Sequence, residues 1–254
     1  MQYLENKTAI VTGGAQGIGR GITLELAKAG ANIIIADLNT ETAQAVIEDA
    51  RNVGRDAIAI PFDVTNKSII SDSIQIALDH FQQIDILVNN AGILTEQGFL
   101  DTTTEEFDLS YEVNLKGVWQ VVNALVPHFK EHNSGKIVNI ASGAARQGLA
   151  ACPAYSAAKA GVISLTQSLA SALGADNINV NAICPGLVKT PLTEKGWDVE
   201  NNPGCFERYV EEHTALGRLV TPQDIGQAVV FLASSRARNI TGQTLNVNSG
   251  DVMS

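Results

Sequence analysis

Short, almost continuously apolar segments alternate with longer stretches of helical periodicity along most of the chain. Most of the apolar segments carry hydrophobic side chains at both alternate positions, which is typical of parallel strands covered on both faces. The predicted strands span residues 8–11, 32–36, 57–60, 84–88, 136–140, 179–183 and 244–247. The predicted helices span residues 17–29, 40–52, 67–82, 105–130, 154–173 and 222–234.

This alternation predicts an α/β fold, in which residues 1–254 form a single doubly wound domain of Rossmann type. Its parallel sheet has seven strands, with helices on both faces. The segment 186–217 interrupts the rhythm and is rich in proline, glycine and charged residues. Loops of this length in compact domains are often lids or binding loops, so we expect a substrate-binding loop or lid here.

Composition narrows the classes of partner. Of the 254 residues, 45% are hydrophobic, which is enough for a substantial core. The formal net charge of −10 argues against duplex nucleic acid and anionic membrane surfaces as partners. A small-molecule substrate is therefore the expected partner.

The sequence shows no targeting or membrane signal. Residues 1–7 lack a basic stretch followed by an apolar run, and no apolar run approaches the roughly 18 residues that a membrane helix needs. The three cysteines, Cys152, Cys184 and Cys205, are odd in number and widely spaced, which fits reduced thiols. We therefore expect a cytoplasmic protein.

A glycine-rich segment follows the first predicted strand and opens the first predicted helix. Residues 12–19 read Thr-Gly-Gly-Ala-Gln-Gly-Ile-Gly. The glycines permit a tight turn and close approach of the backbone to a pyrophosphate, and the helix N-terminus supplies N–H groups. The segment lacks the Gly-Lys-Ser/Thr ending of a mononucleotide loop. Alone it is equally compatible with a tight turn, but its position predicts a dinucleotide site.

Asp37 closes the second predicted strand, 18 residues after Gly19. A carboxylate at this position accepts hydrogen bonds from the adenosine ribose hydroxyls and repels a 2′-phosphate. Neither Gln16 nor the residues after Asp37, Leu38 and Asn39, offer a basic group. The pattern favours NAD over NADP.

Tyr155 and Lys159 are four residues apart on a predicted helix, so both project from the same face. A free tyrosine titrates near pH 10, and an adjacent cation favours the phenolate. A tyrosine tuned in this way can exchange a proton with an alcohol or a carbonyl. Ser142 follows the strand 136–140, at the end of the sheet where α/β proteins bind ligands.

Taken in order, these motifs resemble the short-chain dehydrogenase/reductase family over essentially the whole chain. The matching segments are Thr12 to Gly19, Asp63, Asn89 to Gly92, Asn114, Ser142, Tyr155 with Lys159, and Pro185-Gly186 with Thr190. The resemblance implies that Tyr155 is the catalytic acid/base. Lys159 would lower its pKa and hold the nicotinamide ribose, and Ser142 would bind the substrate oxygen. Asn114 would support a proton relay.

The resemblance also implies the remaining site residues. Cofactor-binding residues are Gly13, Gln16, Gly17, Ile18, Gly19, Asp37, Leu38, Asp63, Val64, Asn90, Ala91, Gly92, Tyr155, Lys159, Pro185, Gly186, Val188 and Thr190, with Asn89 also lining the cleft. Substrate-binding residues are Ser142, Gly143, Ala144, Tyr155, Gly186 and Trp197. The family resemblance further implies a homotetramer.

Two finer resemblances concern the substrate. Residues 184–191 are similar to acetoin and butanediol dehydrogenases, and residues 241–254 are similar to the ends of sorbitol and sorbitol-phosphate dehydrogenases. These groups oxidise secondary alcohols with NAD, so a polyol, sugar or vicinal diol is the leading expectation. A 3-oxoacyl-carrier-protein reductase is the enzymatic alternative, against which Asp37 argues. A cofactor-binding regulator without turnover is the alternative of another class, although such proteins tend to lose Tyr155 or Lys159.

Other signals have simpler explanations. His128 to His132 match the H-x-x-E-H motif of some metalloproteases, but basic residues at a helix end followed by glycine are ordinary end signals. We expect no metal site. Cys152 lies three residues before Tyr155 and would border the substrate cleft as a packed thiol. Trp197 and Phe206 would either form an apolar substrate wall or anchor the segment 186–217.

Overall fold

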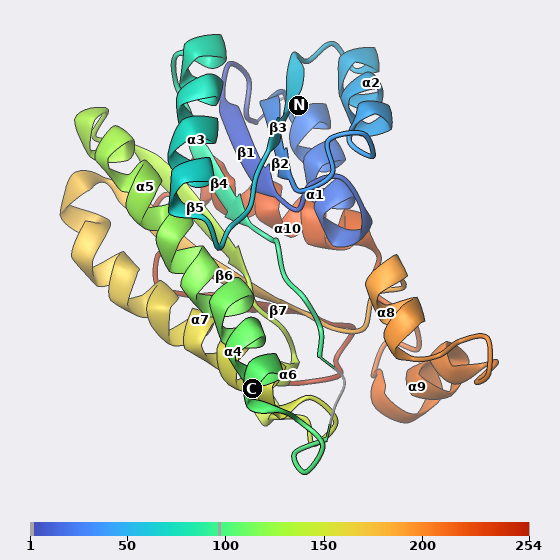
Figure 1. Ribbon diagram of the computed structural model, residues 1–254. Helices are drawn as coiled ribbons and strands as arrows, with labels where there is room; N and C mark the ends of the chain where they lie inside the picture. The colour runs from blue at the N-terminus through green and yellow to red at the C-terminus, as the bar shows by residue number, and fades with distance from the viewer. Residues whose placement is uncertain (1–2, 96–97, 254) are drawn as a thin grey trace.

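A seven-stranded parallel sheet with the strand order β3-β2-β1-β4-β5-β6-β7 forms the centre of the computed structural model (Figure 1), which describes residues 3–95 and 98–253. The strands are β1 (Thr8–Thr12), β2 (Asn32–Asp37), β3 (Ala57–Pro61), β4 (Ile86–Asn89), β5 (Gly135–Ile140), β6 (Ile178–Pro185) and β7 (Thr244–Val247). All six neighbouring pairs are parallel. The predicted doubly wound α/β domain is confirmed.

Helices cover both faces of this sheet (Figure 1). One face packs against α1 (Gly17–Lys28), α2 (Gln44–Asn52) and α10 (Pro222–Ala233). The other face packs against α3 (Lys67–Phe81), α5 (Gly117–Glu131) and α7 (Pro153–Leu173), with α4 (Thr104–Tyr111) leading into α5. The short helix α6 (Ala144–Gln147) follows β5, and the short helices α8 (Pro191–Gly196) and α9 (Cys205–His213) follow β6.

The strands carry the core. Ile10, Ile34 and Leu87 are fully buried on one side of the sheet, and Val11 and Ile35 are fully buried on the other. Burying one such aliphatic side chain contributes about 1.5–3 kcal/mol. The apolar residues at both alternate positions of the sequence therefore correspond to central strands that are buried on both faces of the sheet.

The chain reverses its direction of winding between β1 and β4, which are neighbours in the sheet but far apart in sequence. In sheets of this kind, ligands bind outside the carboxyl ends of the strands at this switch point. The side chain of Thr12, at the end of β1, fixes the junction because its Oγ1 accepts hydrogen bonds from Asn90 N and Ala91 N, both at 3.0 Å. The topology thus places residues 12–19 beside residues 89–92.

The single helix predicted for residues 105–130 is wrong in one respect. A π-helical turn over Glu112–Lys116 separates α4 from α5. The Asn114 side chain in this turn is fully buried and bonds to Ile93, in a segment remote along the chain. Inserted π turns are frequent at functional sites, and this one aims Asn114 at the loop after β4.

The segment predicted as a loop, residues 186–217, contains the two helices α8 and α9, and Val188 forms a parallel bridge with Val220. Thr190 caps α8 by a reciprocal capping box with Thr193, and Pro191 occupies the first turn. We call residues 191–213 the α8–α9 arm, and Figure 1 shows it projecting beside the carboxyl edge of the sheet. Among the described residues, no helix is long and apolar enough to cross a membrane.

Candidate active site

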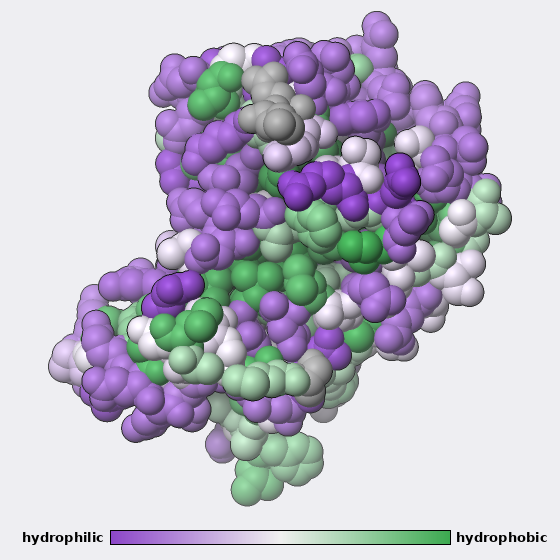
Figure 2. Space-filling model, turned by 180° about the vertical axis from the view of Figure 1, so that it is seen from behind, coloured by the Kyte–Doolittle hydropathy of each residue, from purple (hydrophilic) through white to green (hydrophobic). Residues whose placement is uncertain are grey.

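A cavity of about 580 Å³ lies over the carboxyl ends of the central strands and extends to the α8–α9 arm. This volume falls in the range of small-molecule and cofactor sites. Figure 2 shows apolar surface gathered in the hollowed region between the projecting arm and the body of the molecule. The cavity joins the glycine-rich loop, the Ser142–Tyr155–Lys159 group and the arm in one continuous space.

The glycine-rich loop is shaped for an anion. Gly13 and Gly17 have φ values of +63° and +52°, a region that favours glycine. A Cβ at Gly19 would lie 1.9 Å from the carbonyl oxygen of Gly13, so no other residue fits there. Gln16, which precedes α1, makes no side-chain cap, and the first turn holds no acidic residue. The N–H groups at this helix start therefore lack a side-chain acceptor and suit a pyrophosphate.

Asp37 lies at the end of β2, beside the glycine-rich loop. Its Oδ2 accepts from Ala15 N at 3.1 Å and its Oδ1 accepts from Asn39 N at 3.1 Å. A carboxylate oxygen has further lone pairs, so both atoms can still accept a hydrogen bond from a hydroxyl group. Asp37 lines the cavity, and Lys159 is the one lysine or arginine among its described lining residues.

The loop after β4 forms the opposite wall. The Asn90 amide donates to Thr12 O and Gly13 O, both at 3.0 Å, and so ties this wall to the glycine-rich loop. Gly92 lies against the catalytic groups, since a Cβ there would sit 2.8 Å from Asn114 Oδ1 and 3.4 Å from Lys159 Nζ. The small residues at 91 and 92 keep this wall open to a flat ligand.

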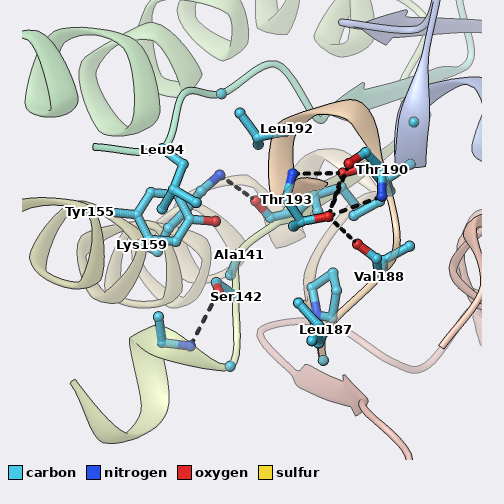
Figure 3. A pocket seen from close by; sticks show the side chains of 18 of the residues that line it. Leu94, Ala141, Ser142, Tyr155, Lys159, Leu187, Val188, Thr190, Leu192 and Thr193 are labelled. Atoms are coloured by element: carbon cyan, nitrogen blue, oxygen red, sulfur yellow. Dashed lines mark hydrogen bonds between the residues drawn. The ribbon is translucent and has the colours of Figure 1, made fainter. Parts of the chain in front are cut away.

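The catalytic side chains come from two elements. Tyr155 and Lys159 lie one turn apart on α7, and Ser142 follows β5 (Figure 3). Ser142 hydrogen-bonds the Tyr155 hydroxyl, and its Oγ also accepts from Ala144 N at 3.1 Å. Lys159 Nζ donates to Ile140 O at 2.9 Å and lies 5.8 Å from the centre of the Tyr155 ring. These groups share one pocket wall, as their spacing predicts.

The electrostatics differ from the expectation that Lys159 lowers the pKa of Tyr155. Burial raises the pKa of Tyr155 to about 12, and the hydrogen bond from Ser142 opposes that rise. Burial also lowers the pKa of Lys159 to about 8. In the protein alone, desolvation is the largest cause of both shifts, and neither group is among the causes of the other group's pKa shift. Tyr155 is therefore a protonated donor at neutral pH, and a further positive charge is needed to make it a base.

Asn114 lies behind the cavity and does not line it. Its amide is fully engaged, because Oδ1 accepts from Ile93 N at 3.1 Å while Nδ2 donates to Ile93 O at 3.0 Å and to Ser110 Oγ at 3.2 Å. These contacts hold the loop that carries Gly92 against Lys159. The side chain acts here as a positioning residue, and a proton relay through it stays a prediction.

Most of the predicted site residues lie together in the cavity. Those that line it are Gly13, Gln16, Gly17, Ile18, Gly19, Asp37, Asn90, Ala91, Gly92, Ser142, Gly143, Ala144, Tyr155, Lys159, Pro185, Gly186, Val188, Thr190 and Trp197. Cys152 also lines it, as expected for a bordering thiol.

Several predicted residues lie outside the cavity lining. Leu38 is 77% exposed, and Val64 is buried beneath Gly117 with its carbonyl accepting from Gln120. Asp63 Oδ1 is engaged by the N–H and hydroxyl of Thr65 at 2.8 and 2.7 Å. Asn89 is buried against Asn139.

Other lining residues were not predicted individually, although those between Leu187 and His213 lie in the segment 186–217 that is expected to bind substrate. They are Leu94, Ile140, Ala141, Gln147, Leu149, Ala151, Leu187, Pro191, Leu192, Thr193, Tyr209, His213 and Asp251. Thr193 had a readable signal, since Thr190-Pro191 followed by Thr193 is a helix-start pattern. Tyr209 and Asp251 had none, because only the folded arm brings them together. The H-x-x-E-H motif has a structural use, since Ile84 N donates to His128 Nε2 at 3.1 Å.

The arm is held by stacked rings. Trp197 stacks on Phe206 at 5.5 Å between centroids and meets Tyr209 edge-on at 5.3 Å. Phe206 is buried and does not line the cavity, whereas Trp197 does. Of the two roles considered for this pair, Phe206 therefore anchors the arm and Trp197 faces the cavity.

A nicotinamide dinucleotide fits these features. The uncapped helix start suits the diphosphate, Asp37 suits a ribose, and Tyr155 with Lys159 occupies the far end of the same cavity. When bound, the group would supply a hydride acceptor and, in its oxidised form, a positive charge.

Comparison with known proteins agrees with this geometry. A family model described as Enoyl-(Acyl carrier protein) reductase matches residues 13–251. The 3-oxoacyl-[acyl-carrier-protein] reductase of Thermotoga maritima is 34% identical over 250 residues, covering 98% of this chain and 99% of its own. Sorbitol dehydrogenase of Cereibacter sphaeroides is 38% identical over 257 residues, covering 99% of each.

A solved structure supports the same relationship. A Sinorhizobium meliloti protein provisionally described as a short-chain alcohol dehydrogenase superposes with a TM-score of 0.91 at 32% identity, covering 97% of this chain and 96% of its own. The agreement extends over the sheet, the glycine-rich loop and the catalytic helix, so the chain is an oxidoreductase that belongs to the short-chain dehydrogenase/reductase family.

Proposed function

We propose that this enzyme interconverts a secondary alcohol and a ketone with NAD, and that its substrate is a polyol, sugar or vicinal diol. The observation that carries the NAD assignment is Asp37, a carboxylate lining the adenosine end of the cavity. A 2′-phosphate at that end would meet a negative charge with no basic side chain to offset it. The nearby Arg20 is paired with Asp49 at 2.8 Å and does not line the cavity.

The chemistry follows from the positions of Ser142, Tyr155 and Lys159. The substrate oxygen lies between the Ser142 and Tyr155 hydroxyls, which hold the carbinol carbon toward the cofactor side of the cavity. In oxidation, Tyr155 takes the hydroxyl proton at its phenol oxygen. In reduction, it returns that proton, and Ser142 stabilises the charge that develops on the carbonyl oxygen.

Lys159 keeps a positive charge 5.8 Å from the centre of the Tyr155 ring and donates to Ile140 O, which fixes the position of its ammonium group. With its pKa lowered to about 8, it remains mostly protonated at neutral pH and can release a proton at mildly alkaline pH. We propose that the proton from Tyr155 leaves through Lys159 and the Asn114 loop.

The polyol assignment is supported by two features. Sorbitol dehydrogenase of Cereibacter sphaeroides is 38% identical to this chain over its full length. The cavity end remote from Asp37 carries polar groups from Gln147, Tyr209 and Asp251 among apolar walls. Such groups can bind the further hydroxyls of a substrate, and a plain hydrocarbon alcohol would leave them without partners.

A 3-oxoacyl-[acyl-carrier-protein] reductase is the second candidate. Its support is the 34% identity to the Thermotoga maritima reductase and the description of the matching family model. Asp37 argues against it, because reductases of that biosynthetic type usually resemble NADP-binding members.

A cofactor and substrate panel tests the proposal. The enzyme is assayed with NAD and with NADP on polyols, vicinal diols and hydroxy acids, and with NADPH on a 3-oxoacyl thioester. We expect polyol or diol oxidation with NAD. Asp37→Ala should reduce the NAD over NADP preference by about 10- to 150-fold, the value of about 1.5–3 kcal/mol for hydrogen bonds to a charged group. Turnover of the thioester alone, with NADPH, would replace the proposal with the second candidate.

We also propose a cytoplasmic homotetramer in which the α8–α9 arm serves as the substrate lid. Exposed apolar side chains along α4 and α5 support self-association, since Phe107, Leu109 and Trp119 are 48%, 51% and 43% exposed. Sedimentation of the purified protein tests this, and a monomer at micromolar concentration would contradict it.

A further inference from the structure

The outer end of the cavity is closed by two segments that lie far apart in the sequence. Tyr209 and His213 come from α9, and Asp251 comes from the segment after β7. The Tyr209 and His213 rings lie 4.7 Å apart, and Tyr209 also meets Trp197 edge-on. All four side chains line the cavity, so whatever part of a substrate extends beyond the reacting carbon must meet them.

One hydrogen bond joins the two segments. The Tyr209 hydroxyl donates to Asp251 Oδ2 at 2.5 Å. Burial of the ring, and then the Asp251 carboxylate, raise the pKa of Tyr209 above its ordinary value, so the phenol stays protonated. Tyr209 is thus a fixed donor, and Asp251 is held as an acceptor at the cavity wall.

The backbone around Asp251 is also fixed. Asp251 N donates to Asn248 O at 3.1 Å, while the Asn248 side chain accepts from Gly250 N at 3.1 Å and donates to Val252 O at 2.7 Å. Residues 248–252 therefore form a hydrogen-bonded turn that holds the Asp251 carboxylate at the cavity wall. Across residues 3–95 and 98–253, no hydrogen bond reaches the second oxygen, Oδ1. One carboxylate oxygen remains able to accept from a ligand.

The charge balance at this end is negative. Lys159, which serves the catalytic group, is the one lysine or arginine in the described lining. The cations on or next to the arm are Lys189, Lys195 and Arg208, and none of them lines the cavity. Lys189 also pairs with Glu194 at 3.6 Å, and Arg208 donates to Pro203 O. The His213 imidazole at this end lies 3.8 Å from the Glu212 carboxylate. A phosphate or carboxylate on the substrate would therefore face Asp251 with no lysine or arginine to compensate it, whereas a hydroxyl would donate to it.

The geometry points to Asp251 as the specificity-determining residue of this enzyme, held in place by Tyr209 as its positioning residue. Asp251 accepts a hydrogen bond from a substrate hydroxyl remote from the reacting carbon, and it excludes substrates that carry an anionic group there. The substrate class is therefore neutral and polyhydroxylated, excluding phosphorylated sugars and hydroxy acids. This inference rests on the proposed alcohol oxidation and adds the residue that selects the alcohol.

The wild-type enzyme provides the first test, which needs no variant. kcat/KM is measured with NAD for the best neutral polyol of the panel and for the same polyol bearing a terminal phosphate. We expect the neutral compound to be preferred by at least about tenfold. Preference for the phosphorylated compound would overturn the inference.

The second test uses Asp251→Asn, which keeps the shape and removes the charge. We expect KM for the neutral polyol to rise about tenfold with kcat within about threefold, because the lost contact is remote from the reacting carbon. We expect kcat/KM for the phosphorylated polyol to rise, because the repulsion is gone. If Asp251 had a purely structural role, Asp251→Asn would lower kcat/KM for the neutral and for the phosphorylated polyol together. That outcome would overturn the inference.

Two further variants serve as comparisons for Asp251→Asn, one at the positioning residue and one at the surface of α9. Tyr209→Phe removes the hydrogen bond and leaves the carboxylate, so KM for the neutral polyol should rise by less than in Asp251→Asn. Glu211→Gln removes an exposed charge of α9 that does not line the cavity, and it should change neither substrate. NAD affinity, followed by fluorescence, should be the same in all three.

The outcomes separate this inference from the proposed function. If the wild-type enzyme oxidises no polyol or diol with NAD, the proposed function fails. If it oxidises a neutral polyol but Asp251→Asn leaves the ratio between neutral and phosphorylated substrates unchanged, only the inference fails.

Discussion

The carboxyl edge of the sheet and the α8–α9 arm border the same cavity, but they are held in different ways. At the edge, backbone groups fix the site, as in the contact of Lys159 with Ile140 O and the close approach of Gly19 to Gly13. The arm relies on side chains, chiefly the Trp197–Phe206 stack and the Tyr209–Asp251 hydrogen bond.

This difference separates two tasks. Contacts to the backbone tolerate few side-chain substitutions. The carboxyl edge is therefore suited to one reaction and one type of cofactor. Side-chain contacts can be exchanged without refolding the sheet, so the arm is the natural place to select a substrate. Variants at the edge should therefore affect every substrate, and variants in the arm should affect some substrates more than others.

The largest effect is expected at the edge, for Tyr155→Phe. Loss of the acid/base hydroxyl should lower kcat by about 10²- to 10⁴-fold. The ring and its packing remain, so the dissociation constant of NAD measured by fluorescence titration should stay within about twofold. Activity close to that of the wild type would remove Tyr155 from the mechanism.

Gly19→Ala should break the cofactor loop. Its Cβ would lie 1.9 Å from Gly13 O, and overpacking of this kind costs about 1–3 kcal/mol, so NAD should bind about 5- to 150-fold more weakly. Gly174→Ala is the matched control, because a Cβ there meets nothing within 4 Å and the residue has φ of −61°. Equal NAD affinity in the two variants would show that the loop does not hold the cofactor.

The pH dependence of the reaction rate should follow the two pKa values that burial shifts at the edge, those of Tyr155 and Lys159. Oxidation needs ionised Tyr155, whose pKa is raised to about 12, so kcat for oxidation should rise by up to about tenfold per pH unit from pH 6. The rise should weaken above about pH 8, where Lys159 loses the charge that supports the phenolate. Ketone reduction needs protonated Tyr155 and should not rise with pH. Initial rates in both directions test this, and faster oxidation at pH 6 than at pH 8 would contradict it.

The smallest effect is expected in the arm, for Trp197→Ala. Trp197 makes two aromatic pairs, with Phe206 and Tyr209, and such a pair contributes about 0.5–1.5 kcal/mol. We expect a loss equivalent to one pair to reach substrate binding, which should raise KM by about 2- to 10-fold. The catalytic groups are untouched, so kcat should change by less than about threefold. Steady-state kinetics on the best substrate measures both values, and a large fall in kcat at constant KM would give Trp197 a catalytic role.

The sequence predicts the edge better than the arm for a physical reason. The strands and the residues Gly13 to Gly19 are local patterns, and their periodicity and spacing determine their place in a doubly wound sheet. Tyr155 and Lys159 share a face of one helix, so their proximity also follows from spacing.

The features that the sequence does not reveal depend on distant contacts. The π turn at Asn114 is set by bonds to Ile93, and no residue within the turn signals it. Tyr209 and Asp251 are 42 positions apart and meet only when α9 folds over the cavity. The raised pKa of Tyr155 depends on its burial, which the spacing of Tyr155 and Lys159 does not contain.

One measurement tests the division between edge and arm most directly: the ranking of kcat/KM over a panel of neutral polyols and diols for Ser142→Ala and Trp197→Ala. Ser142→Ala should lower every value by a similar factor, about 10²- to 10³-fold, and preserve the wild-type order. Trp197→Ala should reorder the panel. A uniform loss for Trp197→Ala, with the order changed by Ser142→Ala instead, would contradict the account.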